Sequence, residues 1–278
     1  AEYRKKPGSF IMFILVHLAT LITVLSIGFL LVYVLVKGIP NLNADIFSWE
    51  YTSDNCSLVP ALINTVYMTL LSLLIAGPIG IFAAIYLVEY AKTGNKLVGV
   101  VRITAETLTG IPSIVYGLFG MLFFTNACGL RLSLISGALT LAIMVLPVIM
   151  RTTEEALMAV PKSYREGSFG LGAGKLRTVF KVVLPSAVPG ILSGIILATG
   201  RIVGETAALI YTAGSVAKMA TKLTDSTRTL AVHMYLLSKE GLHTDQGYAT
   251  AVVLLVLVVL INFASDKIAG KVAADKAN

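Results

Sequence analysis

The sequence predicts an all-α integral membrane protein with six transmembrane helices, and three observations support this class. Apolar residues make up 56% of the 278 residues and charged residues 13%, which is too apolar for an ordinary soluble domain. The apolar residues gather in long runs nearly free of charge, and about 20 such residues cross the hydrocarbon core as a helix. The runs show none of the in-out alternation that a transmembrane barrel requires.

The predicted spans follow in order along the chain at 10–36, 58–88, 103–125, 132–150, 186–213 and 248–265. The first run is longer than the ~7–15 residues of a cleavable signal core, so we expect it to remain as a span. Pro78 in the second span and Pro112 in the third are expected to kink their helices, because a proline removes a helical hydrogen bond.

The chain carries a formal net charge of +7, and the placement of its basic residues predicts the orientation. With both termini in the cytoplasm, most Lys and Arg residues fall on inner segments, as the positive-inside rule requires. The outer segments hold the smaller set Lys37, Arg131, Lys218, Lys222, Arg228 and Lys239. The positive charge therefore indicates a multi-pass protein in contact with membrane lipid, and no nucleic-acid partner.

Two polar segments on the predicted outer side carry groups of interest. Cys56 and Cys128 both fall there, where an oxidising compartment would permit a disulfide; two unrelated loop cysteines are the alternative, because sequence does not show whether their Cα atoms approach. The stretch 214–247 contains a pattern typical of a short helix that does not span. His233 and His243 in it are expected to face water or the interface, since no further metal ligands accompany them.

The stretch "FGLGAGKLR" raises the question of nucleotide binding. A P-loop requires G-x-x-x-x-G-K-[ST], in which the lysine reaches the phosphates and the hydroxyl holds magnesium. Counted back from Gly174 and Lys175, the first glycine and the hydroxyl would stand where the chain has Phe169 and Leu176. We therefore expect this chain to bind no cofactor and to hydrolyse no ATP.

The cytoplasmic region 152–185 fits a pair of short helices instead. Ser163 and Glu166 match an S-x-x-E capping box, which satisfies free N–H groups at a helix start, and they predict a helix from Tyr164. Gly172 is suited to the left-handed position just beyond the end of that helix.

A second helix is expected from about Lys175 to Leu184. Pro185 then opens the fifth span, because proline is well suited to a first helical turn. In the first helix Gly167 and Ser168 are small and leave room for close approach. The helix pair is therefore expected to dock against another protein.

The spacing of these residues resembles the E-A-A-x3-G-x9-I-x-L-P loop of ABC-importer permeases. The matching positions are Glu166, Gly172, Val182, Leu184 and Pro185, and Gly167 and Ser168 replace the two usual alanines. The resemblance implies a type I ABC importer permease fold, in which a cytoplasmic coupling helix inserts into an ATP-binding subunit and passes its closure to the spans. ATP and Mg²⁺ would then be bound by that partner.

The fifth span, "LATGRIVGETAALIYTA", contains Arg201 and Glu205. A charge within a span costs about 2.5–3.5 kcal/mol on insertion scales, so it usually marks a functional path or an ion pair. Pro185 precedes Arg201 by ~24 Å of helix, and the planar guanidinium matches a tetrahedral oxyanion. We hypothesise that Arg201 contacts a transported anion. A structural pair of Arg201 with Glu205, four residues apart on one helical face, is the alternative.

Further stretches resemble the phosphate-specific ABC permeases, the PstA family, over about residues 60–265: "IYLVEYA", "GIPSIVYGLFG", "PVIMRTTEEAL" and "GRIVGETA". The resemblance implies import of inorganic phosphate with a second, homologous permease subunit, two ATP-binding subunits and an extracytoplasmic phosphate-binding protein. It also implies transport roles for Arg201 and Arg151. Because Arg151 lies near the inner end of the fourth span, an anchor to lipid headgroups is its alternative.

Glu106 is a further carboxylate within a predicted span, and we expect it to pair with a basic residue of this chain or of a partner. The chain is expected to divide into an N-terminal helix with an outer loop (1–57), a permease core (58–268) that includes the coupling loop (152–185), and a cytoplasmic tail (269–278).

Three other functions stay open at the level of sequence. Sulfate, molybdate or tungstate would be carried by the same class of permease, although neutral donors more often suffice for them. An ATP-independent channel or secondary transporter would use Arg201 and Glu205 as a gating or ion-coupling pair. An intramembrane enzyme is disfavoured, because no span carries a His pair, an Asp pair or a Ser and His set.

Overall fold

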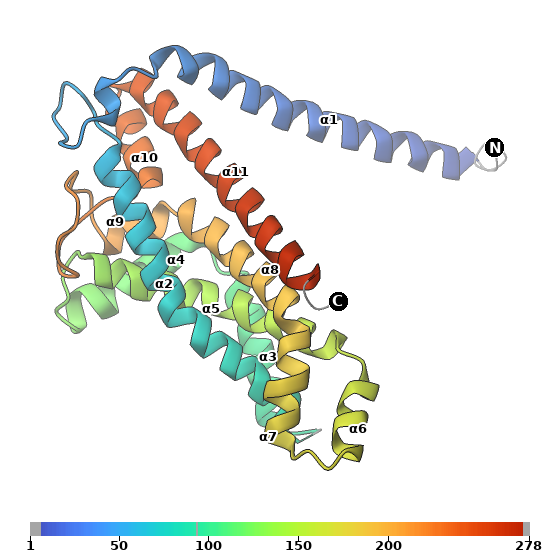
Figure 1. Ribbon diagram of the computed structural model, residues 1–278. Coiled ribbons are helices and arrows are strands. Elements are labelled where there is room, and N and C mark those ends of the chain that lie inside the picture. Colours follow the sequence, from blue (N-terminus) through green and yellow to red (C-terminus); the bar gives the residue numbers. More distant parts are fainter. Residues whose placement is uncertain (1–6, 93, 275–278) are drawn as a thin grey trace.

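The computed structural model describes residues 7–92 and 94–274, and every regular element among them is a helix. Five helical stretches are long and apolar enough to cross a membrane, and a sharply bent helix pair makes a sixth when it is counted as one broken span. The predicted all-α class is confirmed. Figure 1 shows the helices arranged as a bundle from which the first one projects.

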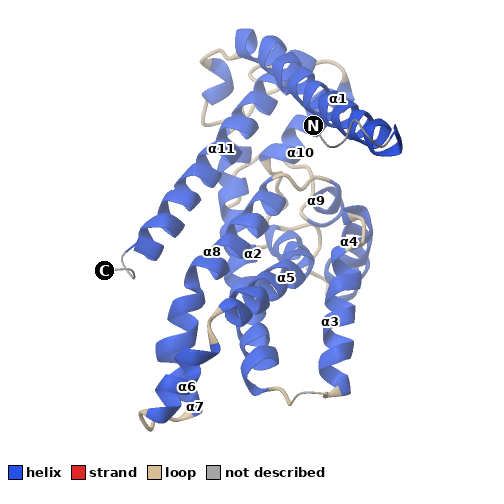
Figure 2. Ribbon diagram, turned by 90° about the vertical axis from the view of Figure 1, so that its right-hand side faces the viewer, coloured by secondary structure: helices blue, strands red, loops and turns tan. Residues whose placement is uncertain are grey.

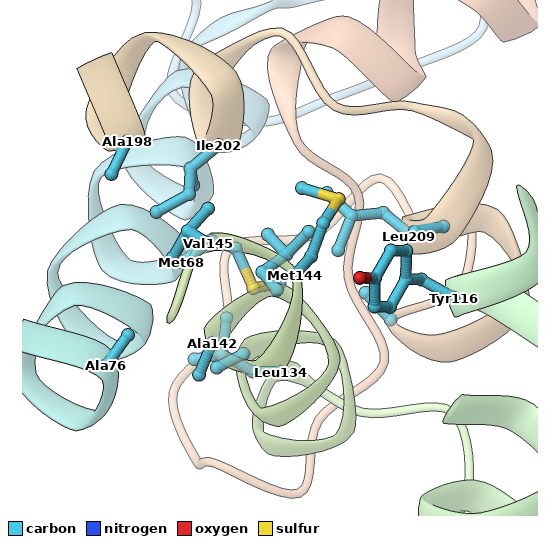
Figure 3. Close-up of a cluster of buried hydrophobic side chains, with 14 of the residues drawn as sticks. Met68, Ala76, Tyr116, Leu134, Ala142, Met144, Val145, Ala198, Ile202 and Leu209 are labelled. Carbon is cyan, nitrogen blue, oxygen red and sulfur yellow. The ribbon is translucent and has the colours of Figure 1, made fainter. Parts of the chain in front are cut away.

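The centre of the bundle is formed by α2 (Val59–Ile85), α5 (Leu134–Ala159) and α8 (Leu184–Val203), which pack on one another. Their facing side chains are fully or almost fully buried. Met144 of α5 and Ile202 of α8 lie in this core (Figure 3). Pro78 is accommodated within α2, which continues past it.

The first span, α1 (Pro7–Gly38), projects from the bundle, and none of its most apolar window is buried within the chain. Its C-terminal end meets α11 (Thr244–Ala274), where the Tyr33 and Tyr248 hydroxyls lie 3.4 Å apart. A surface that is apolar on all sides is suited to lipid or to a partner's spans.

The third predicted span is two helices rather than one. Chain direction turns by 104° between α3 (Lys96–Thr109) and the stretch formed by α4 (Ser113–Gly120) and η5 (Met121–Ala127). The turn falls at "GIP", because Pro112 disfavours helix at the residue before it and takes the first position outside α4. The expected kink at this proline is thus a full break.

The fifth predicted span is also interrupted. α7 (Lys175–Thr178) continues through the π-helix η6 (Val179–Val183) into α8, so the chain is helical from 175 to 203. α8 ends at Val203, and the short helix α9 (Ala207–Thr212) follows after a break at Gly204.

The remaining elements lie at the two ends of the bundle. At one end are η2 (Ile39–Asn41), η3 (Asp45–Phe47) and α10 (Leu230–Glu240); at the other are η4 (Tyr86–Tyr90), α6 (Lys162–Gly170) and α7. Figures 1 and 2 both place α10 and the α6–α7 pair at opposite ends. This separation agrees with the expectation that 152–185 and 214–247 lie on opposite sides of the membrane.

Candidate functional site

The break after α8 separates the two charges of the fifth predicted span. Glu205 lies beyond the end of α8, is buried, and accepts a hydrogen bond from the backbone N–H of Ala208 at 3.0 Å. It forms no ion pair with Arg201 among the described residues. The prediction that Arg201 and Glu205 share one helical face is wrong. A spacing of four residues brings two side chains together only on a continuous helix, and α8 ends between them.

Arg201 itself is half-buried near the end of α8. It lines an open cavity of about 510 Å³ between α8 and α11. The other lining residues are Ser193, Ile196, Leu197 and Gly200 of α8 and Asn262 of α11. The cavity therefore presents a guanidinium and a carboxamide that can donate several hydrogen bonds to an anion. The Ser193 hydroxyl donates to Pro189 O instead.

Arg151 lies in a second cluster of charges, between α3 and α5. Its guanidinium is 3.7 Å from the Glu106 carboxylate on α3 and 3.2 Å from Glu155, one turn further along α5. A parallel contact joins Arg102 of α3 to Glu154 of α5 at 2.5 Å. The expected basic partner of Glu106 is thus Arg151, at the limit of direct pairing distance.

These five charged residues line a cavity of about 290 Å³, which they share with Ala105, Met150 and Met158. It has no lining residue in common with the cavity at Arg201. The structure therefore does not bring the four predicted pathway residues into one site. Arg151 and Glu106 lie together in one cluster, and Arg201 lies in a separate cavity. Glu205 accepts a hydrogen bond at the start of α9.

Sequence reasoning missed several of these contributors. Arg102 stands four residues before Glu106, and Glu154 and Glu155 follow Arg151 closely. This charge pattern near the ends of two predicted spans was a usable signal. Asn262 is a polar residue within "VVLLVLVVLINF". Ser193 had no signal, because a serine within a span often bonds its own backbone, as Ser193 does to Pro189 O.

The coupling loop contains the expected two helices: the second begins at Lys175 as predicted, and the first begins before the predicted Tyr164. α6 begins at Lys162 after Pro161, and no side chain caps it. The predicted capping box of Ser163 and Glu166 is therefore wrong, because Pro161 fixes the helix start and leaves Ser163 inside the first turn. Gly172 has φ +80°, as predicted for the residue that ends this helix.

The junction between the loop and the fifth span matches the prediction for Pro185 only in part. α8 is assigned from Leu184 with Pro185 in its first turn. The chain is nevertheless helical before it, so Pro185 does not separate two helices. Within the loop the Ser168 hydroxyl lies 2.8 Å from the Thr178 hydroxyl and joins α6 to α7.

The loop exposes several large apolar side chains. Leu171 is 91% exposed, and Tyr164, Phe169 and Leu176 are exposed beside it, together with Glu166. Large apolar side chains gathered at the end of a bundle indicate a surface that a partner covers.

At the opposite end of the bundle, the loop between α1 and α2 packs on α10. His233 is fully buried and its Nε2 lies 3.2 Å from Cys56 O, while the Tyr51 ring stacks over the Arg228 guanidinium at 4.6 Å. Burial, and then the Arg228 charge, lower the pKa of His233 to about 3. The expectation of a water-facing His233 is wrong, because the loop around residue 51 covers it.

Cys56 and Cys128 are both free in this structure. Cys56 is buried beneath the outer loop, with its thiol 3.4 Å from Ser53 O, whereas Cys128 is exposed at the end of η5. The disulfide that the sequence left open is therefore not formed in this structure.

Comparison with known proteins agrees with this architecture. A model of the family described as "Binding-protein-dependent transport system inner membrane component" matches residues 76–274. A probable ABC transporter permease protein of Bacillus subtilis, YqgI, is 33% identical over 89% of this chain and 90% of its own length. The phosphate transport system permease protein PstA of Xylella fastidiosa is 40% identical over 64% of this chain and 62% of its own length.

Solved structures share the fold. The matching chain of a bacterial alginate ABC transporter superposes with a TM-score of 0.67 over 96% of this chain and 98% of its own, at 15% identity. That of the MetNI methionine ABC transporter does so with a TM-score of 0.59 over 75% and 93%, at 25% identity. The chain therefore belongs to the binding-protein-dependent inner membrane components, the multi-pass permease subunits of ABC importers with the type I fold.

Proposed function

We propose that this permease imports inorganic phosphate, and that Arg201 contacts the anion on its way. The observation that carries the proposal is the state of Arg201: it lines a cavity of about 510 Å³ and has no ion pair among the described residues. An arginine fork that is not neutralised by its own chain is suited to a tetrahedral oxyanion. The relative whose printed name includes phosphate transport supports the same substrate.

The neighbours of known structure do not favour another substrate. Their titles mention methionine and alginate, and at 25% identity or less they support the fold of this chain and not what it carries. The charged group around Arg151 is a second candidate for the path. Because Glu106 and Glu155 already occupy Arg151, an anion reaching it would have to compete with two carboxylates.

The proposal includes the partners that such an importer requires. A second, homologous permease subunit would complete the pathway, and two ATP-binding subunits would bind ATP and Mg²⁺. One of them would dock on α6, whose exposed apolar side chains support such a contact. An extracytoplasmic phosphate-binding protein would deliver the anion. No cofactor is assigned to this chain, and transport would change no bond of the substrate.

The proposed orientation places both termini in the cytoplasm. The proposed division of the chain is an N-terminal span with an outer loop (1–57), a permease core (58–268) and a cytoplasmic tail (269–278). Sulfate, molybdate or tungstate import is the alternative within the class. Transport without ATP, as a channel or secondary transporter, is the alternative outside it; the apolar surface of α6 would then have no ATPase to cover it.

ATP-driven uptake of labelled phosphate into vesicles that carry the assembled importer tests the proposal. We expect uptake to continue in excess sulfate and to fall at least about tenfold in Arg201→Gln, as loss of a charge-assisted contact predicts. Arg201→Lys, which keeps the charge but not the fork, should be intermediate. Lys96→Gln, which removes an exposed charge at the start of α3, should transport normally.

Each contrary result rejects a different part of the proposal. Full competition by sulfate would reject phosphate as the specific substrate and leave the importer. Uptake that proceeds without ATP would reject the coupling to an ATPase. Normal transport by Arg201→Gln would remove Arg201 from the path.

A further inference from the structure

Arg165 and Glu166 are neighbours on the coupling helix α6 that differ in exposure. The Glu166 side chain is exposed, at the rim of a cavity that Arg165 and Glu89 also line. The Arg165 side chain is 18% exposed and is directed toward the spans. Arg165 is therefore placed to hold α6 to the membrane part of its own chain.

The contacts of Arg165 reach two different spans. Its Nε and Nη2 donate to the Glu89 carboxylate at 3.1 and 2.6 Å. Nη2 also donates to Leu157 O and Nη1 to Val160 O, each at 2.9 Å. Four hydrogen bonds from one planar group fix its position and its plane, which the mobile ammonium of a lysine does not do.

Glu89 belongs to η4, the π-helical end of the second span. Its side chain is 9% exposed, so it has little access to solvent that would replace the arginine. Removal of one member of a buried ion pair leaves the other without compensation. Glu89 and Arg165 therefore act as a unit that joins α6 to the α2–η4 stretch.

Leu157 and Val160 lie at the C-terminal end of α5. The last carbonyls of a helix have no partner within it, and a positive charge there also interacts favourably with the helix dipole. Arg165 supplies both the hydrogen bonds and the charge. The same guanidinium thus closes the end of α5 and binds the end of the α2–η4 stretch.

A second contact connects α6 to the fifth span. The Ser168 hydroxyl lies 2.8 Å from that of Thr178, and α7 is continuous through η6 with α8, which carries Arg201. Alanine, the usual residue of the E-A-A loop at this position, has no hydroxyl for such a contact. Ser168 therefore gives this chain a direct connection between the coupling helix and the span of the proposed anion contact.

We propose that Arg165 is the positioning residue through which a movement of α6 reaches the second and fourth spans. The inference rests on the proposed function, since it assumes that an ATP-binding subunit moves α6. A rigid guanidinium held by Glu89 on one side and by the end of α5 on the other makes α6 and these two ends move together. Without Arg165, α6 still docks on its partner, but its displacement is no longer passed on.

Hydrogen exchange of the importer complex, measured before and after trapping with ATP and vanadate, tests this without reference to the substrate. In the natural protein we expect trapping to change exchange in α6, in η4 (86–90) and at the end of α5 (155–160). In Arg165→Gln the change in α6 should persist, while the changes in η4 and α5 fall about tenfold, within the usual range of coupling between sites. Phosphate imported per ATP hydrolysed should fall by a similar factor.

The variants separate positioning from charge and from folding. Arg165→Lys retains the charge and should recover part of the coupling. Glu89→Ala should resemble Arg165→Gln, and the double variant should be no worse than either single one, because the two residues act as a unit. Lys96→Gln loses a charge elsewhere and should behave like the natural protein.

The inference is overturned if trapping changes exchange in η4 and α5 equally in the natural protein and in Arg165→Gln. If α6 of the natural protein did not respond to trapping at all, the proposed ATP-binding partner and the inference would both be wrong. If the changes spread as expected while phosphate was not imported, the inference would stand and the proposed substrate would fall.

Discussion

The Glu205 carboxylate accepts a hydrogen bond from the Ala208 N–H at 3.0 Å, where α8 has ended and α9 begins. This contact stabilises the start of α9, whose first N–H groups have no partner within the helix. It also leaves Arg201 without the neutralising neighbour that lies closest in sequence. One buried carboxylate therefore supports the break in the span and keeps the proposed anion contact available.

Substitution of Glu205 distinguishes this role from an ion pair with Arg201. Glu205→Gln keeps an oxygen that can accept from Ala208 N, whereas Glu205→Ala removes it. We expect Glu205→Ala to lower the stability of the purified protein by about 0.5–2 kcal/mol, as for other lost helix caps, and Glu205→Gln to cost less. Thermal unfolding in detergent measures both, and equal losses in the two variants would favour the ion pair.

The chain breaks around this site show what sequence was able to predict. Pro112 signalled a disturbance of the third span, but not that the helix would turn by 104°. Gly204 gave no decisive signal, since glycine is common within membrane helices. The two breaks depend on tertiary partners: α4 and α9 pack against each other, and a span can be interrupted only where neighbouring parts satisfy its backbone.

The coupling loop was more predictable than the pathway. Local residue preferences determine its order of helix, left-handed glycine and proline. Gly172 and Pro185 occupy the expected positions. The contact of Arg165 with Glu89 joins residues 76 positions apart. No local pattern specifies such a pair, so its discovery required the folded chain.

The two thiols are expected to react very differently. Cys128 is exposed, whereas Cys56 is 1% exposed and burial raises the pKa of its thiol. Because the thiolate is the reactive form, a membrane-impermeant maleimide should label Cys128 and leave Cys56 unlabelled until the protein is denatured. Labelling of intact right-side-out vesicles also tests the orientation.

The Cys128→Ser variant is the control, and it should take up almost no label when folded. Labelling of Cys128 from the cytoplasmic side would contradict the proposed orientation. Loss of reactivity at both cysteines after mild oxidation would show that the pair forms a disulfide in the membrane.

The lowered pKa of His233 leads us to expect that the protein loses stability in acid. Its pKa is about 3 in the folded chain, because it is buried and lies near Arg228, against 6.5 when unperturbed. The unfolded chain therefore binds the proton more tightly. The contribution of His233 to stability is complete above pH 6.5 and falls by up to about 1.4 kcal/mol per pH unit as the pH decreases toward 3.

The measurement is thermal unfolding between pH 7 and 4.5 for the natural protein and for His233→Gln, whose side chain stays neutral and can still donate to Cys56 O. We expect the natural protein to lose stability more steeply over this range. Parallel curves for the two proteins would show that His233 titrates normally and is not held in the buried site.

Gly117 lies where α4 meets α9, and its lack of a side chain sets the distance between these helices. A Cβ atom there would lie 2.8 Å from Ala208 Cα and 3.2 Å from the carbonyl oxygens of Ala207 and Ala208. These are backbone atoms, so they cannot move aside by a change of rotamer. Gly117→Ala is therefore expected to force α9 away from α4 and to cost about 1–3 kcal/mol, as overpacking does elsewhere.

Gly99→Ala is the matched control, because a Cβ atom at Gly99 of α3 meets nothing within 4 Å. Removing a helical glycine there should leave stability unchanged or raise it by about 0.5–1 kcal/mol. The two variants, compared by thermal unfolding in detergent, differ in packing and not in chemistry. Because α9 follows directly on Glu205, we also expect Gly117→Ala to reduce uptake more than Gly99→Ala does. Equal stability and uptake in the two variants would mean that the close approach of α4 and α9 does not hold the broken span in place.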